Sequence, residues 1–507
     1  MIKLYQKIQN KKLLISCLSI SNLIFINSWL RINAFNIYNY YPLNGYDLSI
    51  ILTTFFSFLI FFVVNYFLIL YLKKKHNLLF SIFLSLLLIL TINSMRSSLN
   101  LDFMSLKNIT TIIIYFAIII TLLFLLIVKK DIINKFFIQF GLITFSFFFI
   151  ILFKVIFNIA TLEPINTDKI NKSVFNEKNY IQSNNKNKII WIIFDQLDSK
   201  FFRNENLKEI NLNNFQQIIS NSDYYIKYTP ITEETTKEIP SILSGKNYSK
   251  YKYVIKNNKI RLKFSESKDY KIWNTNSTIF NDLKSKNLNL YINGWYHPYC
   301  SLVKDLYAKC FHSLYGYFTT LKFRGFFNTL LFQFVSIIPG YEFIIKMTKI
   351  DKLKIFTQQG SEFLEAKINF SNASEDFLST LENNQMDFYF FHSSVPHEPF
   401  IYNSSERRLI NNYYTEKSEY IDNLKLVDDF LGKVIKILKA NDNFDSSIII
   451  IQGDTGIGKD YINSKVEDRI GSTPLFIKNS FQRNANIIDD ILLSNDLSKK
   501  INKILFN

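Results

Sequence analysis

Two histidines and two aspartates stand where their side chains could take part in chemistry. The segment HSSVPHEP contains His392 and His397, which are two of only five histidines in the chain. Asp195 ends the apolar run KIIWIIFD, and Asp454 ends the run SSIIIIQGD. Imidazoles can bind a transferred group, protonate a leaving oxygen or reach a metal, and carboxylates at strand ends are natural metal ligands. Transfer of a phosphoryl or sulfuryl group needs such groups together with a nucleophile.

A third segment, TEETTKEIP at 232–240, could supply the nucleophile. It contains Thr232, Thr235 and Thr236 just before a predicted helix, whose N-terminal dipole would favour an alkoxide and an anionic adduct. The structural alternative is that these threonines are ordinary capping residues. Likewise, Asp195 could be a turn or cap residue, and we predict that Asp198 is a helix cap.

The elements that must position these residues alternate between apolar runs and helical patterns. This alternation predicts a mostly parallel sheet covered by helices on both faces, with sites where the strand C-terminal ends meet loops. Helices are expected near 277–286 and 411–441. The predicted strands are 188–194, 223–231, 288–294, 387–393, 446–454 and 473–478.

The N-terminal third of the chain is of a different kind. Five apolar segments are long enough to span a bilayer, which takes about 20 residues. They lie near 13–31, 49–72, 78–95, 109–128 and 136–158. The first is not a cleavable signal peptide, because no small-residue cleavage site follows it. We therefore expect a transmembrane domain at 1–162, a polar linker at 163–187 and an outer domain at 188–507.

Basic residues in the short loops predict the orientation. The loops on one side contain Lys3, Lys7, Lys11, Lys12, Lys73, Lys74, Lys75, Lys129, Lys130 and Lys135. The opposite loops contain only Arg31, Arg96 and Lys107. This bias puts the N-terminus in the cytoplasm of a bacterium and the outer domain beyond its inner membrane, in the periplasm or extracytoplasmic space.

One apolar and aromatic stretch, at 317–347, interrupts the outer domain. A sixth span there would split the candidate site across the membrane, so we expect an interfacial or core-packed helical hairpin. Cys300 and Cys310 lie ten residues apart in the same domain. An oxidising compartment favours a disulfide between them over two free thiols or a metal pair, since the nearby His297 and His312 lack zinc-finger spacing.

Two other functions are disfavoured by the residue pattern. The net charge of +17 comes largely from lysine clusters beside apolar segments, without an arginine-rich stripe, so we expect no nucleic-acid partner. Residues 453–459 read G-x-x-x-x-G-K, but Asp460 stands where a P-loop needs Ser or Thr. ATP is also absent outside the cytoplasm, so we expect no ATP site and interpret Asp454 as part of an altered metal motif.

The order of these motifs resembles a known family. The segments IIFDQLD, TEETTKEIPSILSG, HSSVPHEPF, GDTG and TPLFIK follow five predicted spans and a linker. In this order they resemble the membrane-anchored, sulfatase-like proteins of the alkaline phosphatase superfamily, such as lipid A phosphoethanolamine transferases and lipoteichoic acid synthases. The resemblance covers nearly the whole chain and implies an α/β alkaline-phosphatase-like outer domain.

The resemblance also implies roles for individual residues. Thr235 would be the covalent nucleophile, and Asp195, Thr235 and Asp454 would hold one divalent metal ion. The family has a histidine where this chain has Thr455, a weak ligand or replacement, and no histidine follows it in the chain. The remaining oxygen-only set suits Ca²⁺, Mg²⁺ or Mn²⁺ better than Zn²⁺.

The expected function is therefore a membrane-anchored enzyme with a lipid or glycan of the cell envelope as its substrate. It would transfer or hydrolyse a phosphoethanolamine- or phosphoglycerol-type group, or a sulfate, near membrane lipid. The alternative is a metal-free pseudoenzyme that binds or assembles an envelope polymer. A transporter is disfavoured because the predicted spans hold almost no charge apart from Lys154.

Overall fold

The computed structural model describes most of the chain. The described residues are 2–33, 48–98, 121, 131–161, 173–181, 187–256, 259–264, 270–272, 276, 278–297, 299–303, 305–313, 317–339, 341, 345, 358–411, 413, 416–457 and 465–506.

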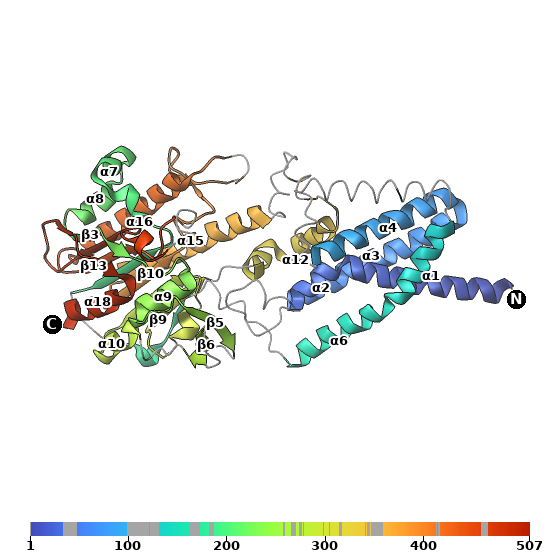
Figure 1. Cartoon of the computed structure of the whole chain (residues 1–507), viewed down its shortest axis with the longest axis horizontal. Helices are drawn as coiled ribbons and strands as arrows, with labels where there is room; N and C mark the ends of the chain where they lie inside the picture. The colour runs from blue at the N-terminus through green and yellow to red at the C-terminus, as the bar shows by residue number, and fades with distance from the viewer. Residues whose placement is uncertain are drawn as a thin grey trace. The chain divides into compact units, whose positions relative to one another are not determined.

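The chain divides into two compact units (Figure 1). Unit 1 comprises Met1–Ile165 and Thr320–Thr357, and unit 2 comprises Asn166–Thr319 and Gln358–Asn507. The chain therefore passes between the units three times. Most of the apolar stretch at 317–347, which the sequence places in the outer domain, groups with the N-terminal helices instead.

Unit 1 is built of apolar helices. Their bounds are α1 Ile2–Ile24, α2 Ile26–Asn33, α3 Leu48–Lys75, α4 Asn77–Ser98, α6 Phe145–Thr161 and α12 Tyr317–Ser336. Among the described residues, three helices are long and apolar enough to cross a membrane: Ile50–Lys75, Asn77–Arg96 and Asp131–Thr161. They fit a membrane-anchored protein.

The predicted number of five spans is thus not reached in the described residues. The predicted spans 49–72, 78–95 and 136–158 coincide with the three helices. The predicted span 13–31 is helical but interrupted between α1 and α2, and it does not satisfy the same length and apolarity. The predicted span 109–128 lies outside the described residues except for Thr121.

Small and polar side chains pack the helices of unit 1 against one another. The hydroxyl groups of Ser19 and Thr144 are 2.8 Å apart, and Ser16 donates to the carbonyl oxygen of Ile138 at 2.9 Å. A Cβ added at Gly141 would collide with Ser16, so a glycine is needed for this close approach. Helices in a membrane associate through such small residues and neutral hydrogen bonds, because apolar contact alone gains little against lipid.

Unit 2 is built on a mixed sheet, which has nine strands in the part of the chain that the structure describes. The strand order is β1-β9-β8-β10-β2-β13-β14-β3-β15. The bounds are β1 Val174–Phe175, β2 Ile189–Phe194, β3 Asp223–Tyr225, β8 Leu290–Trp295, β9 Lys309–Ser313, β10 Phe388–Ser393, β13 Ile448–Gly453, β14 Leu475–Lys478 and β15 Asn486–Ile488. The central strands β9, β8, β10, β2 and β13 are parallel, and β14 is antiparallel to its neighbours β13 and β3.

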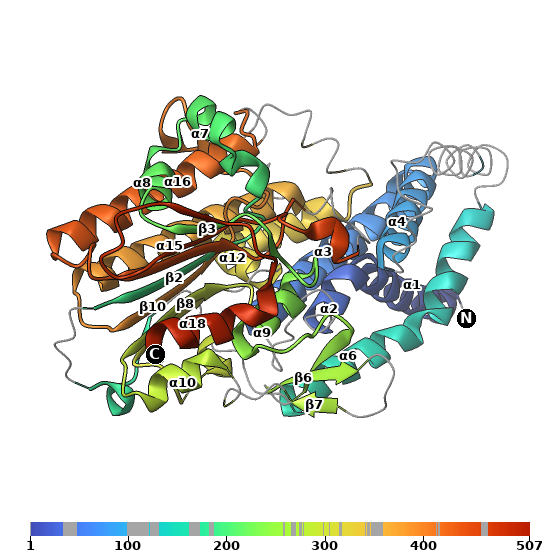
Figure 2. The same cartoon turned by 60° about the vertical axis from the view of Figure 1, so that its left-hand side comes forward.

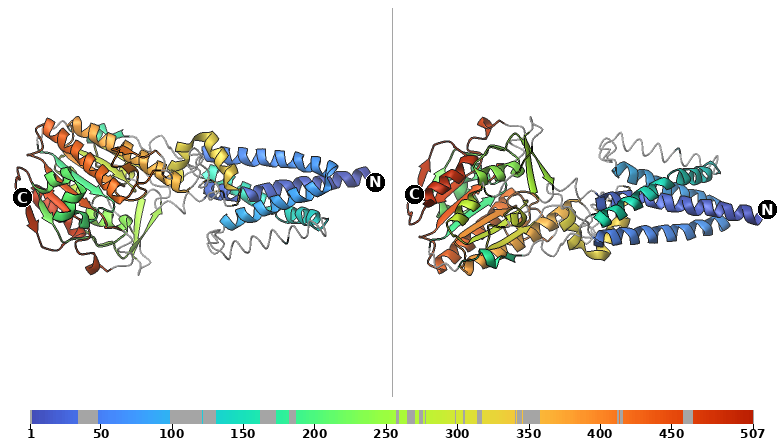
Figure 3. Two further views of the ribbon diagram at one scale, coloured as in Figure 1. Left: turned by 90° about the horizontal axis from the view of Figure 1, so that it is seen from above. Right: turned by 90° about the horizontal axis from the view of Figure 1, so that it is seen from below.

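Helices cover both faces of this sheet (Figure 2). One face packs against α8 (Asn213–Ile219), α15 (Gln358–Glu382) and α16 (Tyr420–Ala440), and the last two run side by side (Figures 2 and 3). The opposite face carries α9 (Thr235–Ser244), α10 (Ile279–Ser285) and α18 (Leu497–Phe506).

Side chains of the central strands alternate between these two layers, as the period of a strand requires. Phe391 on β10 stacks on Phe430 of α16, with ring centroids 4.9 Å apart. Its neighbour Phe390 faces the other way and contacts Phe280 of α10 at 5.2 Å. Because both faces are buried, the strands are apolar throughout, which explains their continuous apolar runs in the sequence.

Smaller elements complete the unit. They are β4 Tyr228–Thr229, β5 Tyr251–Lys256, β6 Lys259–Phe264, β7 Tyr270–Ile272, β11 Tyr402–Asn403, β12 Arg408–Leu409, β16 Leu492–Leu493, α7 Asn204–Ile210 and α11 Tyr299–Leu302. The single strand predicted at 223–231 is wrong. This segment divides into β3, which pairs with β14 and β15, and β4, which pairs with β16 in a separate sheet.

Candidate functional site

The ends of four neighbouring parallel strands lie level with one another. Phe194, the last residue of β2, is paired with Ser393 of β10 on one side and with Gly453 of β13 on the other. His392 on β10 is paired with Gly294 of β8. The residues that follow these ends therefore meet at one edge of the sheet, which is where α/β proteins place their sites.

Asp454 is at the centre of this edge and is fully buried. Its Oδ2 accepts a hydrogen bond from the hydroxyl of Thr235 at 2.8 Å. Its Oδ1 accepts from the backbone N–H groups of Gln196 at 3.2 Å and Thr455 at 2.6 Å. The preceding Gly453 is needed for this placement, because a Cβ there would collide with the carbonyl oxygen of Leu197.

Asp195 lies beside Asp454, and neither carboxyl reaches solvent appreciably. Burial raises the pKa of Asp195 to about 7, while hydrogen bonds from Asp454 and the Gln196 backbone moderate the rise. Burial also raises the pKa of Asp454 well above its ordinary value, and repulsion by Asp195 adds to it. Two adjacent buried carboxylates cannot both stay charged alone, so the pair is stable when it shares a proton or a cation.

Thr235 is the first residue of α9, and its side chain is half-buried. Its neighbours Thr232 and Thr236 are buried more deeply. Thr232 uses its hydroxyl to accept from the backbone N–H of Glu234 at 3.3 Å. Of the three threonines, Thr235 is thus the one whose hydroxyl is hydrogen-bonded to Asp454. The N-cap residue Glu234 makes no side-chain capping bond, which leaves the helix N-terminus available to an anion.

His392 is the second-last residue of β10 and is fully buried. Its Nδ1 and the phenol oxygen of Tyr299 are 2.8 Å apart. Burial lowers the pKa of His392 well below its ordinary value, and His297 adds to the effect. Burial raises the pKa of Tyr299, so this contact joins a protonated phenol to a neutral imidazole. Gly294 leaves room for the Tyr299 ring, which a Cβ at that position would strike.

His297 joins the site although the sequence pattern did not single it out as a site residue. Its Nε2 lies 3.2 Å from the carbonyl oxygen of Thr235, and its ring centroid is 6.3 Å from that of His392. Burial lowers its pKa to about 3, so it is neutral and donates from Nε2. The signal was available, since His297 comes two residues after the end of β8, at the same edge of the sheet as Asp195 after β2.

The remaining predicted residues take separate places. His397 is only partly buried, in the loop after β10, and its backbone N–H donates to the carbonyl oxygen of Asp195 at 3.2 Å. Thr455 is buried, and its hydroxyl lies 3.4 Å from Asp454 Oδ1. Asp198 is a cap, as predicted, because its carboxylate accepts from the backbone N–H of Lys200 at 2.9 Å.

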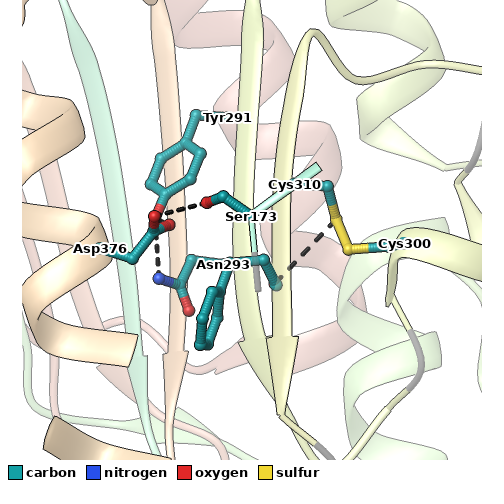
Figure 4. Close-up of a disulfide and its surroundings, with 7 residues drawn as sticks. Ser173, Tyr291, Asn293, Cys300, Cys310 and Asp376 are labelled. Carbon is teal, nitrogen blue, oxygen red and sulfur yellow. Dashed lines mark hydrogen bonds between the residues drawn. A yellow bond between two sulfur atoms is a disulfide. The ribbon is translucent and has the colours of Figure 1, made fainter. Parts of the chain in front are cut away.

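The predicted disulfide is confirmed. Cys300 and Cys310 are bonded, with their Cα atoms 5.7 Å apart (Figure 4). The bond joins α11, whose first residue is Tyr299, to β9. It therefore holds the residue that contacts His392 against the sheet. Beside it, Asn293 donates to the phenol oxygen of Tyr291 at 2.7 Å, and Tyr291 donates to Asp376 at 2.5 Å (Figure 4).

The predicted metal ligands can be tested on their chemistry. Asp195, Asp454 and Thr235 bring two carboxylates and one hydroxyl together, which are ligands for a hard divalent cation. Within the described residues, no group of three or more His, Cys, Asp or Glu side chains could hold a metal ion. These three oxygen ligands would hold Ca²⁺, Mg²⁺ or Mn²⁺ only together with water or substrate oxygens, and they lack the nitrogen and sulfur ligands that Zn²⁺ prefers.

No protein-family model matches the chain, and no curated protein sequence matches it. Solved structures do resemble it. The phosphonate monoester hydrolase SpPMH from Silicibacter pomeroyi is similar at 14% identity, with a TM-score of 0.41, over 63% of this chain and 73% of its own. The lipoteichoic acid synthase LtaP from Listeria monocytogenes is similar at 13% identity, with a TM-score of 0.38, over 67% of this chain and 77% of its own.

A protein in the alkaline phosphatase superfamily from Vibrio parahaemolyticus is similar at 15% identity, with a TM-score of 0.38. It is matched over 64% of this chain and 67% of its own.

Proposed function

We propose that this protein is a membrane-anchored hydrolase or transferase in which Thr235 accepts a phosphoryl or sulfuryl group. The observation that carries the proposal is the 2.8 Å hydrogen bond from the Thr235 hydroxyl to Asp454 Oδ2, at the start of a helix. A nucleophile hydrogen-bonded to a base within this distance is the arrangement that covalent group transfer needs.

The residues of the chain would act in two steps. In the first, Asp454 takes the proton of the Thr235 hydroxyl, and the threonine oxygen bonds to phosphorus or sulfur while the bond to the leaving oxygen breaks. His397, the partly exposed histidine of the site, would protonate that leaving oxygen. In the second step, water or an acceptor hydroxyl gives its proton to His397 and attacks the same phosphorus or sulfur atom. The bond from that atom to the Thr235 oxygen breaks, and Thr235 recovers its proton from Asp454.

Several features of the site support this sequence of steps. Asp454 Oδ2 already accepts the hydrogen bond of the Thr235 hydroxyl at 2.8 Å, so it is placed to take that proton. The first turn of α9 directs N–H groups at an anion on Thr235. His297 holds the Thr235 carbonyl oxygen and so helps to fix the start of that helix. A divalent cation held by Asp195, Asp454 and Thr235 would offset the charge on the substrate oxygens.

The proposed substrate is a lipid or glycan of the cell envelope that carries a phosphoethanolamine- or phosphoglycerol-type group or a sulfate ester. Candidate membrane-spanning helices in the same chain support a substrate or donor at a bilayer surface. The lysine-rich loops support an orientation in the bacterial inner membrane with unit 2 in the periplasm. Nucleic acid and ATP are not among the proposed partners.

The test uses the full chain in lipid nanodiscs, loaded in turn with Ca²⁺, Mg²⁺, Mn²⁺ and Zn²⁺. Retained metal is measured by elemental mass spectrometry, and turnover is measured on chromogenic phosphodiesters and sulfate esters. We expect one hard cation per chain, lost in Asp454→Asn. The matched control is Asp428→Asn, which alters another buried aspartate, one that accepts hydrogen bonds from the backbone of α8 rather than from Thr235.

A second candidate function is favoured by one observation, the Thr455 side chain in the place where the resembled family has an imidazole. It is a pseudoenzyme that binds or assembles an envelope polymer. Retention of none of the four metals, together with no turnover on either class of ester, would support this candidate and contradict the enzymatic one. A Thr455→His variant should gain zinc affinity if the altered motif is a metal motif.

A further inference from the structure

The segment after Gly325 in α12 buries polar side chains and exposes apolar ones. Gly325 interrupts the helix with a φ of 71°. Beyond it, the polar Thr329 and Gln333 are buried, while the Phe327 side chain is 82% exposed. Leu331 and Ile338 are exposed as well. A helix on a water-soluble surface would show the opposite arrangement, because water favours polar side chains on the outside.

Polar contacts attach this segment to the apolar helices of unit 1. Gln333 accepts a hydrogen bond from the hydroxyl of Ser57 at 2.7 Å and donates to the hydroxyl oxygen of Thr54 at 2.9 Å, both on α3. Asn93 on α4 donates to the carbonyl oxygen of Ile337 at 3.2 Å. Neutral side-chain hydrogen bonds of this kind join helices within a membrane.

The exposed face of the segment continues the exposed apolar face of α3. The ring of Phe326 lies edge-on to that of Phe56, with centroids 6.1 Å apart, and both rings are partly exposed. The α3 face includes the exposed residues Leu52, Phe55, Phe56, Leu59 and Ile60. Since α3 is a candidate membrane span, the most direct occupant of this continuous surface is lipid hydrocarbon. Asn328 is exposed near the Gly325 break, where a polar group would reach the headgroup level.

The connectivity of the chain limits how far residues 325–339 can enter the bilayer. The chain reaches it from unit 2 and returns to unit 2, so it cannot cross the bilayer an odd number of times without dividing that unit. The helical run Phe326–Ser336 has 11 residues. At 1.5 Å per residue it is about 16 Å long, roughly half of a hydrocarbon core of about 30 Å.

We infer that residues 325–339 form a re-entrant membrane element. Its outer face contacts lipid hydrocarbon, its polar inner face binds α3 and α4, and it anchors unit 2 to the bilayer at a second point along the chain. This inference does not depend on the proposed enzymatic function.

Spin labelling of the full chain in proteoliposomes tests the lipid contact. A nitroxide at Phe327→Cys, in a Cys17→Ala background, should collide readily with oxygen, which concentrates in lipid, and rarely with a water-soluble nickel chelate. The matched control is Phe481→Cys in unit 2, where the native side chain is 66% exposed and the opposite pattern is expected. Free access of the nickel chelate to position 327 would overturn the inference. Shielding of that position from both reagents would also overturn it, because it would mean a contact with protein.

A second experiment tests the anchor. A protease site is placed in the 163–187 linker of the full chain, and the cleaved proteoliposomes are washed with alkaline carbonate. Unit 2 should remain with the membrane, because the chain still enters unit 1 at 320–357. Release of unit 2 into the supernatant would show that the linker was its only firm attachment and would overturn the second anchor.

Discussion

The two units bury different kinds of polar residue. In the described part of unit 1, every buried polar residue is Ser, Thr, Asn or Gln, and large apolar side chains such as Phe67 and Phe153 face outward. Unit 2 has an apolar core but also buries residues with titratable or permanently charged side chains, among them Asp454, Glu238 and Arg469. Polar groups in unit 1 are therefore suited to joining helices, whereas those in unit 2 can also perform chemistry.

The buried charges of unit 2 are themselves sorted along the sheet. Lys188, just before β2, donates to the carbonyl oxygens of Asn384 and Met386 at 3.1 and 2.9 Å. Lys478, at the end of the antiparallel β14, donates to the carbonyl oxygens of Asp445 and Ser447 at 2.9 and 3.1 Å. These lysines satisfy backbone groups at the edge where the parallel strands begin. The paired carboxylates lie where those strands end, which is the edge at which we propose the chemistry to occur.

The largest expected effect comes from removing the proposed nucleophile. Thr235→Ala should lower turnover by about 10³-fold or more, because the covalent step has no other hydroxyl on Asp454 Oδ2. Steady-state and single-turnover kinetics, with mass spectrometry of the modified residue, measure it.

The matched control for that prediction is Thr236→Ala, which removes the neighbouring hydroxyl in the same turn of α9. It should retain most of the activity, and Thr235→Ser should retain more than Thr235→Ala. Equal losses of turnover in Thr235→Ala and Thr236→Ala would contradict the proposed nucleophile. They would leave no evidence that the reaction occurs at this edge of the sheet rather than elsewhere in unit 2.

Glu238 offers a sharper test of the buried charges. Burial raises its pKa from 4.5 to about 8, with Asp454 adding to the rise and Arg469 opposing it. The folded state thus holds a proton that the unfolded state loses, so this contribution to stability is complete below about pH 4.5 and disappears as the pH rises through 8. Glu238→Gln should flatten the decline in unfolding free energy between pH 5 and 8 by up to about 1.4 kcal/mol per pH unit.

Denaturant unfolding of the full chain at a series of pH values measures this slope. Glu234→Gln is the control, because Glu234 is exposed at the start of the same helix and forms a surface ion pair with Lys237. Its variant should keep the wild-type slope. An unchanged slope in Glu238→Gln would mean that Glu238 is charged in the folded protein.

The strand pattern could predict the site only in part. Continuous apolar runs locate β2, β10 and β13, and the rule that sites follow parallel strand ends selects Asp195 and Asp454, which the register places together. The same rule applies to His297 after β8, but the nearby Cys300 made a disulfide the simpler interpretation of this segment. The contact between Tyr299 and His392 could not be predicted, because it depends on how the short helix α11 packs onto β8.

The parts of the fold that depend on local sequence pattern could be predicted. The parts that depend on pairing between distant segments could be predicted less well. The apolar run at 223–231 reads as one strand, yet its two halves pair with different sheets. Gln333 stands in an apolar stretch with no local partner, and its partners Thr54 and Ser57 are nearly 280 residues away. Sequence spacing alone cannot indicate such a contact.

The disulfide links two elements of unit 2 covalently. The helices in the described part of unit 1 are joined by side-chain packing and hydrogen bonds, and Cys17 there is free. Replacing Cys300 and Cys310 together by serine should reduce the unfolding free energy of unit 2 by about 3 kcal/mol, because the closed loop of roughly ten residues restricts the unfolded chain. Chemical denaturation followed by tryptophan fluorescence, to which the buried Trp191 of unit 2 contributes, measures the loss. Treating the wild type with a reductant should shift it to the same midpoint, and Cys17→Ser in unit 1 should leave it unshifted. A double variant as stable as the wild type would contradict the prediction.

The smallest expected effect is in unit 1, at the contact between α12 and α3. Gln333→Leu should weaken this unit by about 1 kcal/mol, since interhelical hydrogen bonds in membranes contribute little on average and leucine restores apolar contact. A double-mutant cycle with Ser57→Ala isolates the pair and should give a coupling energy of about 0.5–1 kcal/mol in detergent unfolding experiments. The control cycle pairs Gln333→Leu with Thr91→Ala instead of Ser57→Ala. The Thr91 hydroxyl donates to the Leu87 carbonyl oxygen of its own helix at 2.8 Å, so this pair should show no coupling energy. A coupling of several kcal/mol would mean that the buried polar groups of unit 1 carry as much free energy as those of unit 2. The two units would then differ in the kind of polar residue that they bury, but not in how strongly those residues bind.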